Sequence, residues 1–288
     1  MNFEEMSSDQ RSRALVDALP YIKEFHGSVV VVKYGGNSHA VGPALDSFAD
    51  DIVFLRSVGI NVVVVHGGGP QVDEAMKLHG IEPVRIDGLR VTNEETLRIA
   101  RMVLVGQVGR EIVSAINKHG GFAVGTTGED GRLITAHVKD EKLGFVGEVD
   151  EINSDILESL LVQELVPVVA PIGISSEGQS LNINADEAAS AIAAGLNAKK
   201  LIFMSNIPGL LKDVEDQTSI ISEISILEAK QLISSKTISE GMIPKVLSCI
   251  EAVEAGVEKA HIIDGRVQHS LLVELFSDAG LGTMFSKK

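Results

Sequence analysis

The sequence predicts an α/β fold in which a parallel β-sheet is covered by helices on both faces. Residues 29–32 and 62–65 are two runs of valine, which is typical of strands that are buried on both sides. Each run ends in glycines, and a helical pattern of apolar residues follows each of them. This alternation of strand, glycine-rich loop and helix is the arrangement that builds parallel sheets.

The remaining segments continue this alternation along the chain. Short and mostly apolar runs are expected to form further strands at residues 122–126, 166–170, 201–204 and 260–263. Helical patterns are expected at residues 44–57, 94–118, 155–164, 186–196 and 244–255. Residues 133–149 depart from the alternation and predict a hairpin with a charged tip at 139–142. The sequence leaves open whether this hairpin is a lid over a substrate or an edge pair.

An amphipathic helix is predicted before the first strand, over residues 9–25. Its apolar side chains recur at three- and four-residue spacing from Ala14 to Phe25. Pro20 is expected to kink this helix or to divide it in two, because proline removes a backbone hydrogen bond and clashes with the preceding turn. The apolar stripe needs a cover, which either the same domain or another subunit could supply.

The composition excludes several classes of protein. The 288 residues carry a formal net charge of −15 and no basic run, which argues against general nucleic-acid binding. Cys249 is the only cysteine, so an intramolecular disulfide and a cysteine-based zinc site are excluded. The amino terminus is acidic and no apolar run reaches ~18 residues, so neither a secretory signal nor a membrane span is expected. The cytosol is therefore the expected compartment.

The familiar nucleotide and hydrolase signatures are missing from the sequence. It has no G-x-x-x-x-G-K-[ST] loop, no strand followed by G-x-G-x-x-G and no G-x-S-x-G elbow. The eight histidines show no paired metal-ligand spacing, and we interpret His66 as a structural residue at a strand end rather than as a base. Neither a P-loop ATPase nor a dinucleotide-dependent dehydrogenase is therefore supported.

The glycines at the ends of the two valine strands predict a phosphate site. Lys33 comes at the carboxyl end of the first strand and is followed by Gly35 and Gly36, and the second strand ends in the glycines 67–69. Ligands of open α/β sheets bind at this edge, where glycine lets backbone N–H groups approach an anion closely. A second lysine, Lys245, begins a predicted helix, where a cation is unfavourable unless an anionic ligand is near.

Two further polar motifs have both a structural and a ligand-binding interpretation. Arg90 follows a turn, and its guanidinium could hold a carboxylate by two parallel hydrogen bonds or form a surface ion pair. Asn182 and Asn184 alternate with apolar residues before a predicted helix, and Asp186 is a candidate N-cap of that helix. The sequence alone does not choose between these interpretations.

Five motifs, taken in order, resemble those of the amino-acid kinase family. They are Lys33-Tyr34-Gly35-Gly36, His66-Gly67-Gly68-Gly69-Pro70, Asp87-Gly88-Leu89-Arg90-Val91-Thr92, Asn182-Ile183-Asn184-Ala185-Asp186 and Gly241-Met242-Ile243-Pro244-Lys245. The resemblance runs from about residue 28 to the carboxyl terminus, and it is strongest to the branch that phosphorylates N-acetyl-L-glutamate in arginine biosynthesis. It implies a three-layer αβα sandwich with an open, mainly parallel sheet, preceded by a kinked N-terminal helix.

The resemblance also implies how the chain is divided into functional regions. Residues 1–27 would form an oligomerisation helix, and residues 28–187 would form an N-lobe that binds the amino acid and dimerises. Residues 188–288 would form a C-lobe with the ATP site and a site for arginine. Mg²⁺ would bind through the ATP phosphates, with no metal held by the protein itself.

Matched residue by residue, the resemblance assigns roles to the polar motifs. Lys33 and Lys245 would grip the transferring phosphoryl group, and Asp186 would hold both lysines in place. Phosphate oxygens would be stabilised by amides around four glycines, Gly35, Gly36, Gly68 and Gly69. The acetylated amino acid would be bound by residues of three motifs, namely Gly68, Gly69, Arg90, Asn182 and Asn184.

Both ends of the chain resemble those of the arginine-inhibited members of the family. These members are similar in having a mobile, kinked N-terminal helix that joins dimers into a hexameric ring, a trimer of dimers, and residues 18–22 match this element. Residues 274–283 look like the C-terminal signature of the inhibited enzymes. By this resemblance L-arginine would be contacted by Tyr21, Lys200, His261, Glu274 and Gly280.

The match to the family is incomplete at two positions, and other interpretations stay open. Ser205-Asn206 stands where relatives often have an Asp, and Asn93 replaces another common Asp, so details of nucleotide binding are left open. The second candidate is a related kinase that acts on an aminoadipate derivative in lysine biosynthesis. Its carrier-bound substrates favour a basic lid, whereas the tip at 139–142 is charge-neutral.

Two more alternatives concern the whole chain. Aspartokinase is disfavoured, because no room for its regulatory domains follows Thr283. The chain could also be a non-catalytic arginine sensor, or mainly a partner for a nitrogen-signalling PII protein. The intact Lys33, Asp186 and Lys245 argue against a loss of catalysis.

Overall fold

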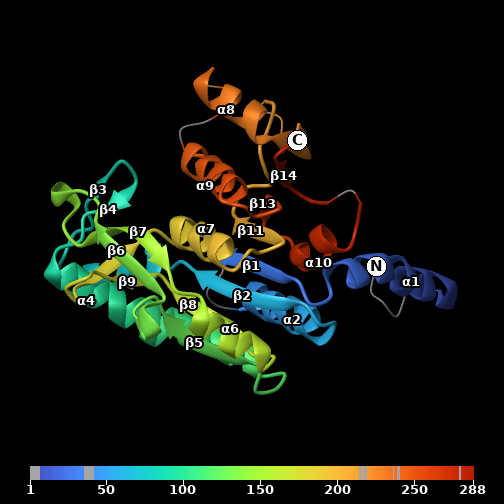
Figure 1. Cartoon of the computed structure of the whole chain (residues 1–288), viewed down its shortest axis with the longest axis horizontal. Coiled ribbons are helices and arrows are strands. Elements are labelled where there is room, and N and C mark those ends of the chain that lie inside the picture. Colours follow the sequence, from blue (N-terminus) through green and yellow to red (C-terminus); the bar gives the residue numbers. More distant parts are fainter. Residues whose placement is uncertain are drawn as a thin grey trace.

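The main feature of the fold is one large, mostly parallel sheet. The computed structural model describes residues 7–35, 42–213, 216, 219–235, 237–238, 241–278 and 280–288. Within them the sheet is built from β1 (Val29–Tyr34), β2 (Asn61–His66), β5 (Ala123–Thr127), β8 (Val166–Ala170), β11 (Lys200–Ser205), β12 (Glu223–Ser225), β13 (Lys259–Asp264) and β14 (Thr283–Ser286). The spatial order is β12-β14-β13-β11-β1-β2-β8-β5, with β1 at the centre (Figure 1).

The strand directions confirm the predicted parallel sheet. All neighbours from β13 to β5 run parallel, and only β14 joins β13 in the antiparallel direction. Each strand that the apolar runs predicted is present, with bounds that differ by at most two residues. Such a sheet needs cover on both faces, which explains why β1 and β2 consist of buried valines.

Helices form a layer on each face of the sheet. One face is covered by α2 (Pro43–Ser57), α3 (Gly69–Leu78), α4 (Glu94–Arg101), α5 (Gly109–Asn117) and α10 (Ser270–Leu275). The other face is covered by α6 (Asp155–Val162), α7 (Ala185–Gly195), α8 (Ile226–Ser234) and α9 (Ile243–Glu254). Side chains alternate along β1, so Val30 and Val32 face the α2 layer whereas Val31 faces the α7 layer.

The helix expected at residues 94–118 is interrupted by a π-helical segment. This segment, η2 (Met102–Val108), joins α4 to α5, and the Gly109 N–H bonds to the Leu104 carbonyl five residues earlier. The wider turn brings side chains against the second glycine loop. A Cβ at Gly68 would lie 2.6 Å from the Leu104 side chain and 3.2 Å from that of Val108. A side chain at position 68 would therefore have to push the Leu104 side chain of η2 aside.

The predicted hairpin at 133–149 is confirmed, and it is part of a larger unit. The antiparallel strands β6 (Ile134–Val138) and β7 (Val146–Ile152) join β9 (Ile172–Ile174) and β10 (Ser180–Ile183) in a small closed barrel. The charged tip holds a short 3₁₀ turn, η4 (Glu141–Leu143). A second hairpin, β3 (Arg85–Ile86) with β4 (Leu89–Arg90), lies beside the barrel (Figure 1). Its turn has positive φ angles at Asp87 and Gly88, as a type I′ turn requires.

The predicted N-terminal helix forms as a single element, α1 (Ser8–Phe25), and Pro20 does not divide it. Ser7 and Gln10 form a capping box at its start. Figure 1 shows α1 at the side of the molecule next to α10. Its last turn packs on the core, but Leu15 and Val16 are 66% and 65% exposed. Within the described residues the first half of the apolar stripe therefore has no cover.

No helix among the described residues has the length and apolarity needed to cross a bilayer.

An Asp-His pair, in which the aspartate is buried and the histidine is 49% exposed, connects α2 to the loop between β13 and α10. Asp51 is 1% exposed, and its Oδ1 lies 2.6 Å from Nδ1 of His269. The backbone N–H of His269 also donates to the Ser47 hydroxyl at 3.0 Å. Burial raises the pKa of the Asp51 carboxyl to about 6, although the hydrogen bond from His269 lowers it in part.

This pair predicts a pH-dependent contribution to stability. The folded-state pKa of Asp51, about 6, lies above the value of 3.8 for a free side chain, so its contribution is full below pH 3.8 and is lost as the pH rises through 6. Asp51→Asn keeps an acceptor for His269 without the charge. Its gain in the free energy of unfolding should be about 3 kcal/mol larger at pH 8 than at pH 4, measured by urea unfolding. Asp155→Asn, at an exposed position on α6, is the control, and a pH-independent gain in Asp51→Asn would contradict the prediction.

Candidate functional site

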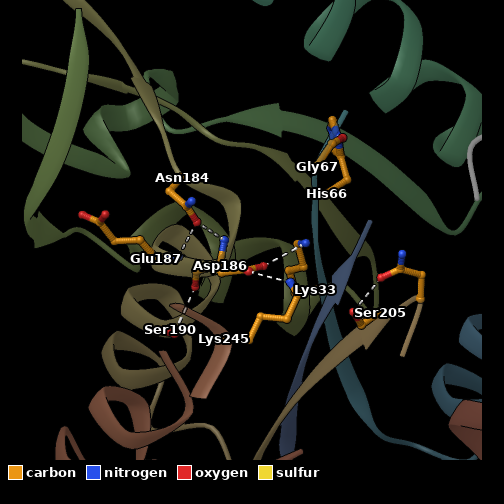
Figure 2. A network of polar contacts seen from close by, with 10 residues as sticks. Lys33, His66, Gly67, Asn184, Asp186, Glu187, Ser190, Ser205 and Lys245 are labelled. Atoms are coloured by element: carbon orange, nitrogen blue, oxygen red, sulfur yellow. Dashed lines mark hydrogen bonds and ion pairs between the residues drawn. The ribbon is translucent and has the colours of Figure 1, made fainter. Parts of the chain in front are cut away.

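Asp186 joins the two predicted lysines into one cluster. Its Oδ1 lies 2.8 Å from Nζ of Lys33, and its Oδ2 accepts a hydrogen bond from Nζ of Lys245, also at 2.8 Å (Figure 2). The three residues come from the end of β1, the first turn of α7 and the first turn of α9. Lys33 has the same orientation as Val31 on β1, so it faces the layer that contains α7 and α9.

Asn184, rather than Asp186, is the N-cap of α7, which corrects one interpretation of the sequence. The Asn184 side-chain oxygen accepts from the backbone N–H groups of Asp186 at 2.8 Å and of Glu187 at 3.2 Å. Both Asn and Asp are favoured caps, and here the cap is the side chain two residues earlier. The Asp186 carboxylate is thereby available for the two lysines.

The charges of this cluster favour an anionic ligand. Burial alone would raise the pKa of Asp186, but the ammonium groups of Lys33 and Lys245 hold it well below the usual range. The carboxylate is therefore ionised at neutral pH. Two lysines against one carboxylate leave one positive charge in excess at a largely buried place. A cation in such surroundings is stabilised when an anion binds beside it.

The two glycine loops and the polar motifs line one cavity beside this cluster. The cavity has a volume of about 240 Å³. Every predicted site residue that the structure describes, other than Lys245 and the arginine group, lines it: Lys33, Gly35, Gly68, Gly69, Arg90, Asn182, Asn184 and Asp186. Lys245 is joined to it through Asp186. Gly36, the remaining predicted phosphate-binding residue, lies outside the described residues.

Arg90 is fixed at the wall of this cavity by a residue that the sequence analysis did not identify. NH1 of Arg90 donates to Asp73 on α3, and NH2 donates to the Gly69 carbonyl at 2.9 Å. Burial alone would raise the pKa of Asp73, but Arg90 and Arg85 lower it. No signal in the spacing links Asp73 to an arginine seventeen residues later, because α3 and β4 meet only in the folded chain.

A larger cavity of about 640 Å³ lies between the β6-β7 hairpin, α7 and α9. Glu187 connects these elements: its carboxylate accepts from Lys139 on the hairpin side at 3.2 Å and from the Val149 N–H at 3.0 Å. The hairpin is thus anchored directly beside Asp186. The walls of this cavity are mainly acidic or apolar, whereas both glycine loops and Arg90 line the smaller one. The smaller cavity is therefore the better candidate for an anion.

The five residues predicted to contact arginine form a second cluster on the opposite face of the sheet. His261 Nδ1 lies 2.6 Å from Glu274, and burial lowers the pKa of His261. Glu274 also accepts from the Leu281 N–H at 2.6 Å, and a Cβ at Gly280 would lie 3.0 Å from this carboxylate. Tyr21 bonds to Asp278, and Lys200 lies over the Phe25 ring at 4.9 Å.

Among the described residues, no group of three or more His, Cys, Asp or Glu side chains gathers as metal ligands would.

Comparison with known proteins adds sequence and fold relatives. A family model described as "Amino acid kinase family" matches residues 28–264. An acetylglutamate kinase from Caldanaerobacter subterraneus subsp. tengcongensis is 47% identical over 280 residues, covering 96% of this chain and 94% of the relative. One from Methanothrix thermoacetophila is 47% identical over 285 residues, covering 96% and 99%.

Two solved structures share the fold. N-acetylglutamate synthase from Neisseria gonorrhoeae, in complex with coenzyme A and N-acetyl-glutamate, superposes with a TM-score of 0.85 at 25% identity. The superposition covers 96% of this chain but only 63% of the synthase, which is longer. Carbamate kinase from Giardia lamblia bound to AMP-PNP superposes with a TM-score of 0.69 at 18% identity, over 91% of this chain and 99% of the carbamate kinase. The second likeness concerns the fold alone.

Proposed function

We propose that this chain, which belongs to the amino acid kinase family, is an acetylglutamate kinase of arginine biosynthesis. It would transfer the γ-phosphoryl group of ATP to the γ-carboxylate of N-acetyl-L-glutamate. The observation that carries the proposal is the Lys33-Asp186-Lys245 cluster beside two glycine loops in one small cavity. Further support comes from relatives named acetylglutamate kinase, which match nearly the whole chain at 47% identity.

The chemistry of this transfer fits a site that contains lysines and amides but no evident base. A γ-carboxylate has a reference pKa of about 4.3 and is already ionised at neutral pH. One of its oxygens forms a bond to the γ-phosphorus, while the bond from that phosphorus to the β-γ bridging oxygen breaks and ADP leaves. The barrier is largely the approach of one anion to another, so positioning and charge neutralisation supply the catalysis.

The residues divide naturally between the two substrates. Lys33 and Lys245 would contact the transferring phosphoryl group, and the amides of Gly35, Gly68 and the neighbouring loop residues would stabilise its oxygens. Arg90, whose plane Asp73 and Gly69 fix, suits a planar carboxylate of the amino acid. Asn182, which donates to the Thr92 hydroxyl at 3.3 Å, and Asn184 complete this wall.

The nucleotide would occupy the C-terminal part of the chain. In this proposal residues 28–187 form the lobe for the amino acid and residues 188–288 the lobe for ATP. Lys245, in the first turn of α9, would meet the phosphates where the helix N-terminus is also positive. Mg²⁺ would bind through the ATP phosphates and neutralise part of their charge. This agrees with the cavity, in which Asp186 is the one acidic side chain among the described residues and is already bonded to two lysines.

The direct test is a coupled assay of ADP release. N-acetyl-L-glutamate, N-acetyl-L-aminoadipate and L-aspartate are offered in parallel with MgATP. We expect turnover with N-acetyl-L-glutamate to exceed the other two by at least roughly tenfold in kcat/KM, because one methylene is worth about this much in a fitted pocket. A preference for the aminoadipate derivative would instead support the alternative function, a kinase of lysine biosynthesis. The absence of turnover with all three would favour a non-catalytic sensor.

The role of Lys245 can be tested separately. Lys245→Ala removes one of the two cations beside the phosphoryl group, and we expect kcat to fall by roughly 100-fold or more. The fold should persist, because Asp186 keeps Lys33 as a partner. Lys230→Ala is the matched control, since this exposed lysine also pairs with a residue of α9, Glu254. Turnover unchanged in Lys245→Ala would remove this residue from the mechanism.

We further propose that L-arginine inhibits the enzyme at the cluster of Tyr21, Lys200, His261, Glu274 and Gly280. The support is a buried carboxylate, Glu274, that can pair with a guanidinium and lies near the end of α1. The N-acetylglutamate synthase from Neisseria gonorrhoeae has also been solved with coenzyme A and L-arginine. The exposed stripe of α1 would join dimers into a hexamer, since it is uncovered within the described chain.

Removal of residues 1–25 tests both parts of this proposal. We expect the mass in light scattering to fall from that of a hexamer to that of a dimer, because the stripe with Leu15, Val16 and Leu19 is lost. The arginine concentration for half-inhibition should rise roughly tenfold, because Tyr21 is lost as well. A variant with serine at Leu15, Val16 and Leu19 should dissociate while Tyr21 remains. Arg13→Ala, on the same exposed helix, is the control, and an unchanged mass after the deletion would contradict the proposal.

A further inference from the structure

His66 makes a hydrogen bond that the proposed function does not use. Its ring is 0% exposed, and Nδ1 lies 2.8 Å from the carbonyl oxygen of Gly67 (Figure 2). A carbonyl oxygen can only accept, so Nδ1 must carry the proton and Nε2 must be the unprotonated nitrogen. Burial lowers the pKa of His66 to about 4, so the ring keeps this neutral form at physiological pH.

The position of His66 on β2 determines which way the next peptide points. Val62 and Val64 face the α2 layer, so His66 lies on that face as well, next to Gly109 at the start of α5. In a trans peptide the C=O of one residue and the N–H of the next point in opposite directions. A Gly67 carbonyl held toward the ring therefore directs the Gly68 N–H to the other side. Lys33, which lines the cavity together with Gly68, lies on that side.

The loop needs such a restraint because it consists of three glycines. Glycine has no Cβ to limit its backbone, and an unrestrained run would sample many peptide orientations. The Gly67 N–H is held by the Tyr34 carbonyl at 2.9 Å, and the Gly69 carbonyl is held by Arg90 at 2.9 Å. Between these two bonds, the Gly67 carbonyl is fixed by His66 alone among the hydrogen bonds of the described chain.

Packing alone does not account for a histidine at this position. Four valines precede it on β2, and Nε2 is buried with no hydrogen-bond partner in the described chain. A buried and half-satisfied imidazole stabilises a core less than an apolar side chain of similar size. The residue is therefore better explained by the bond that it donates.

We propose that His66 is a positioning residue that aims the Gly68 amide at the phosphoryl group during transfer. The inference rests on the proposed phosphoryl transfer. His66 touches neither substrate: it acts by holding the Gly67-Gly68 peptide, so that the amide is already oriented when negative charge spreads over the phosphate oxygens. A hydrogen-bond donor that is already oriented stabilises the transition state strongly and the bound substrates only a little.

Two substitutions at His66 test this. His66→Leu removes the donor and keeps an apolar side chain, and we expect kcat to fall roughly 10- to 100-fold. Dissociation constants for N-acetyl-L-glutamate and MgATP should stay within about twofold, and the thermal midpoint should not fall. The affinity for MgADP with aluminium fluoride, a mimic of the transferring group, should fall by the same factor as kcat. His66→Asn should restore most of kcat, because its side-chain nitrogen is attached to Cγ as Nδ1 is.

A second pair of variants covers the case in which His66→Leu does not fold. A Cβ at Gly109 would lie 3.1 Å from His66 Nε2 and 3.1 Å from the Leu104 carbonyl oxygen, so Gly109→Ala should press on both. We expect it to lower kcat more in the protein with His66 than in the His66→Asn background, where only the contact with the Leu104 carbonyl remains.

Several outcomes would overturn the inference. These are an unchanged kcat in His66→Leu, an Asn variant as slow as the Leu variant, or an equal effect of Gly109→Ala in both backgrounds. Wild-type turnover is measured first with each carboxylate. No turnover at all would overturn the proposed function itself, whereas normal turnover with an unaffected His66→Leu would overturn only the role of His66.

Discussion

The Asp186 carboxylate and its two lysines are the interaction on which the rest of the site depends. Lys33 ends a strand of the sheet, and Lys245 begins a helix on the far side of α7. Without the carboxylate between them, two ammonium groups would repel each other in a place where water screens little. Asp186 therefore fixes the positions of both cations and joins the first turn of α9 to β1. Asn184 supports this arrangement, because it caps α7 in place of Asp186 and so leaves the Asp186 carboxylate available for the lysines.

Much of the fold could be predicted from the sequence, because the buried parallel strands β1 and β2 consist of uninterrupted runs of valine. The features that were missed depend on contacts between distant segments. The π-helical segment η2 has no sequence signature that we recognise, and its close packing on Gly68 is visible only in the folded chain. The two-residue strands β3 and β4 are too short to show any periodicity. Pro20 did not divide α1, because the carbonyl it leaves unbonded belongs to the exposed Val16 and can bond to water.

The candidate site was predictable in its members but not in its connections. Lysines and glycines at strand ends indicated an anion, and the order of the motifs indicated the family. The partners that hold these residues were not visible: Asp73 for Arg90 and Glu187 for the hairpin. The sequence led us to interpret His66 as structural rather than as a base, and only the folded chain shows that it bonds to the carbonyl of its own neighbour. The sequence gives the type of each residue, whereas the orientation of its side chain depends on contacts that form only when the layers pack together.

The two clusters lie on opposite faces of the sheet and are linked through the neighbouring strands β1 and β11. Lys200 begins β11 and pairs in register with Val30, whereas Lys33 is three residues further along β1. Three residues of strand span roughly 10 Å, so the two lysines are separated by about this distance along the strands. A ligand near Lys200 would therefore reach Lys33 through the paired strands rather than by direct contact. The register of β1 with β11 thus sets the separation of the two clusters.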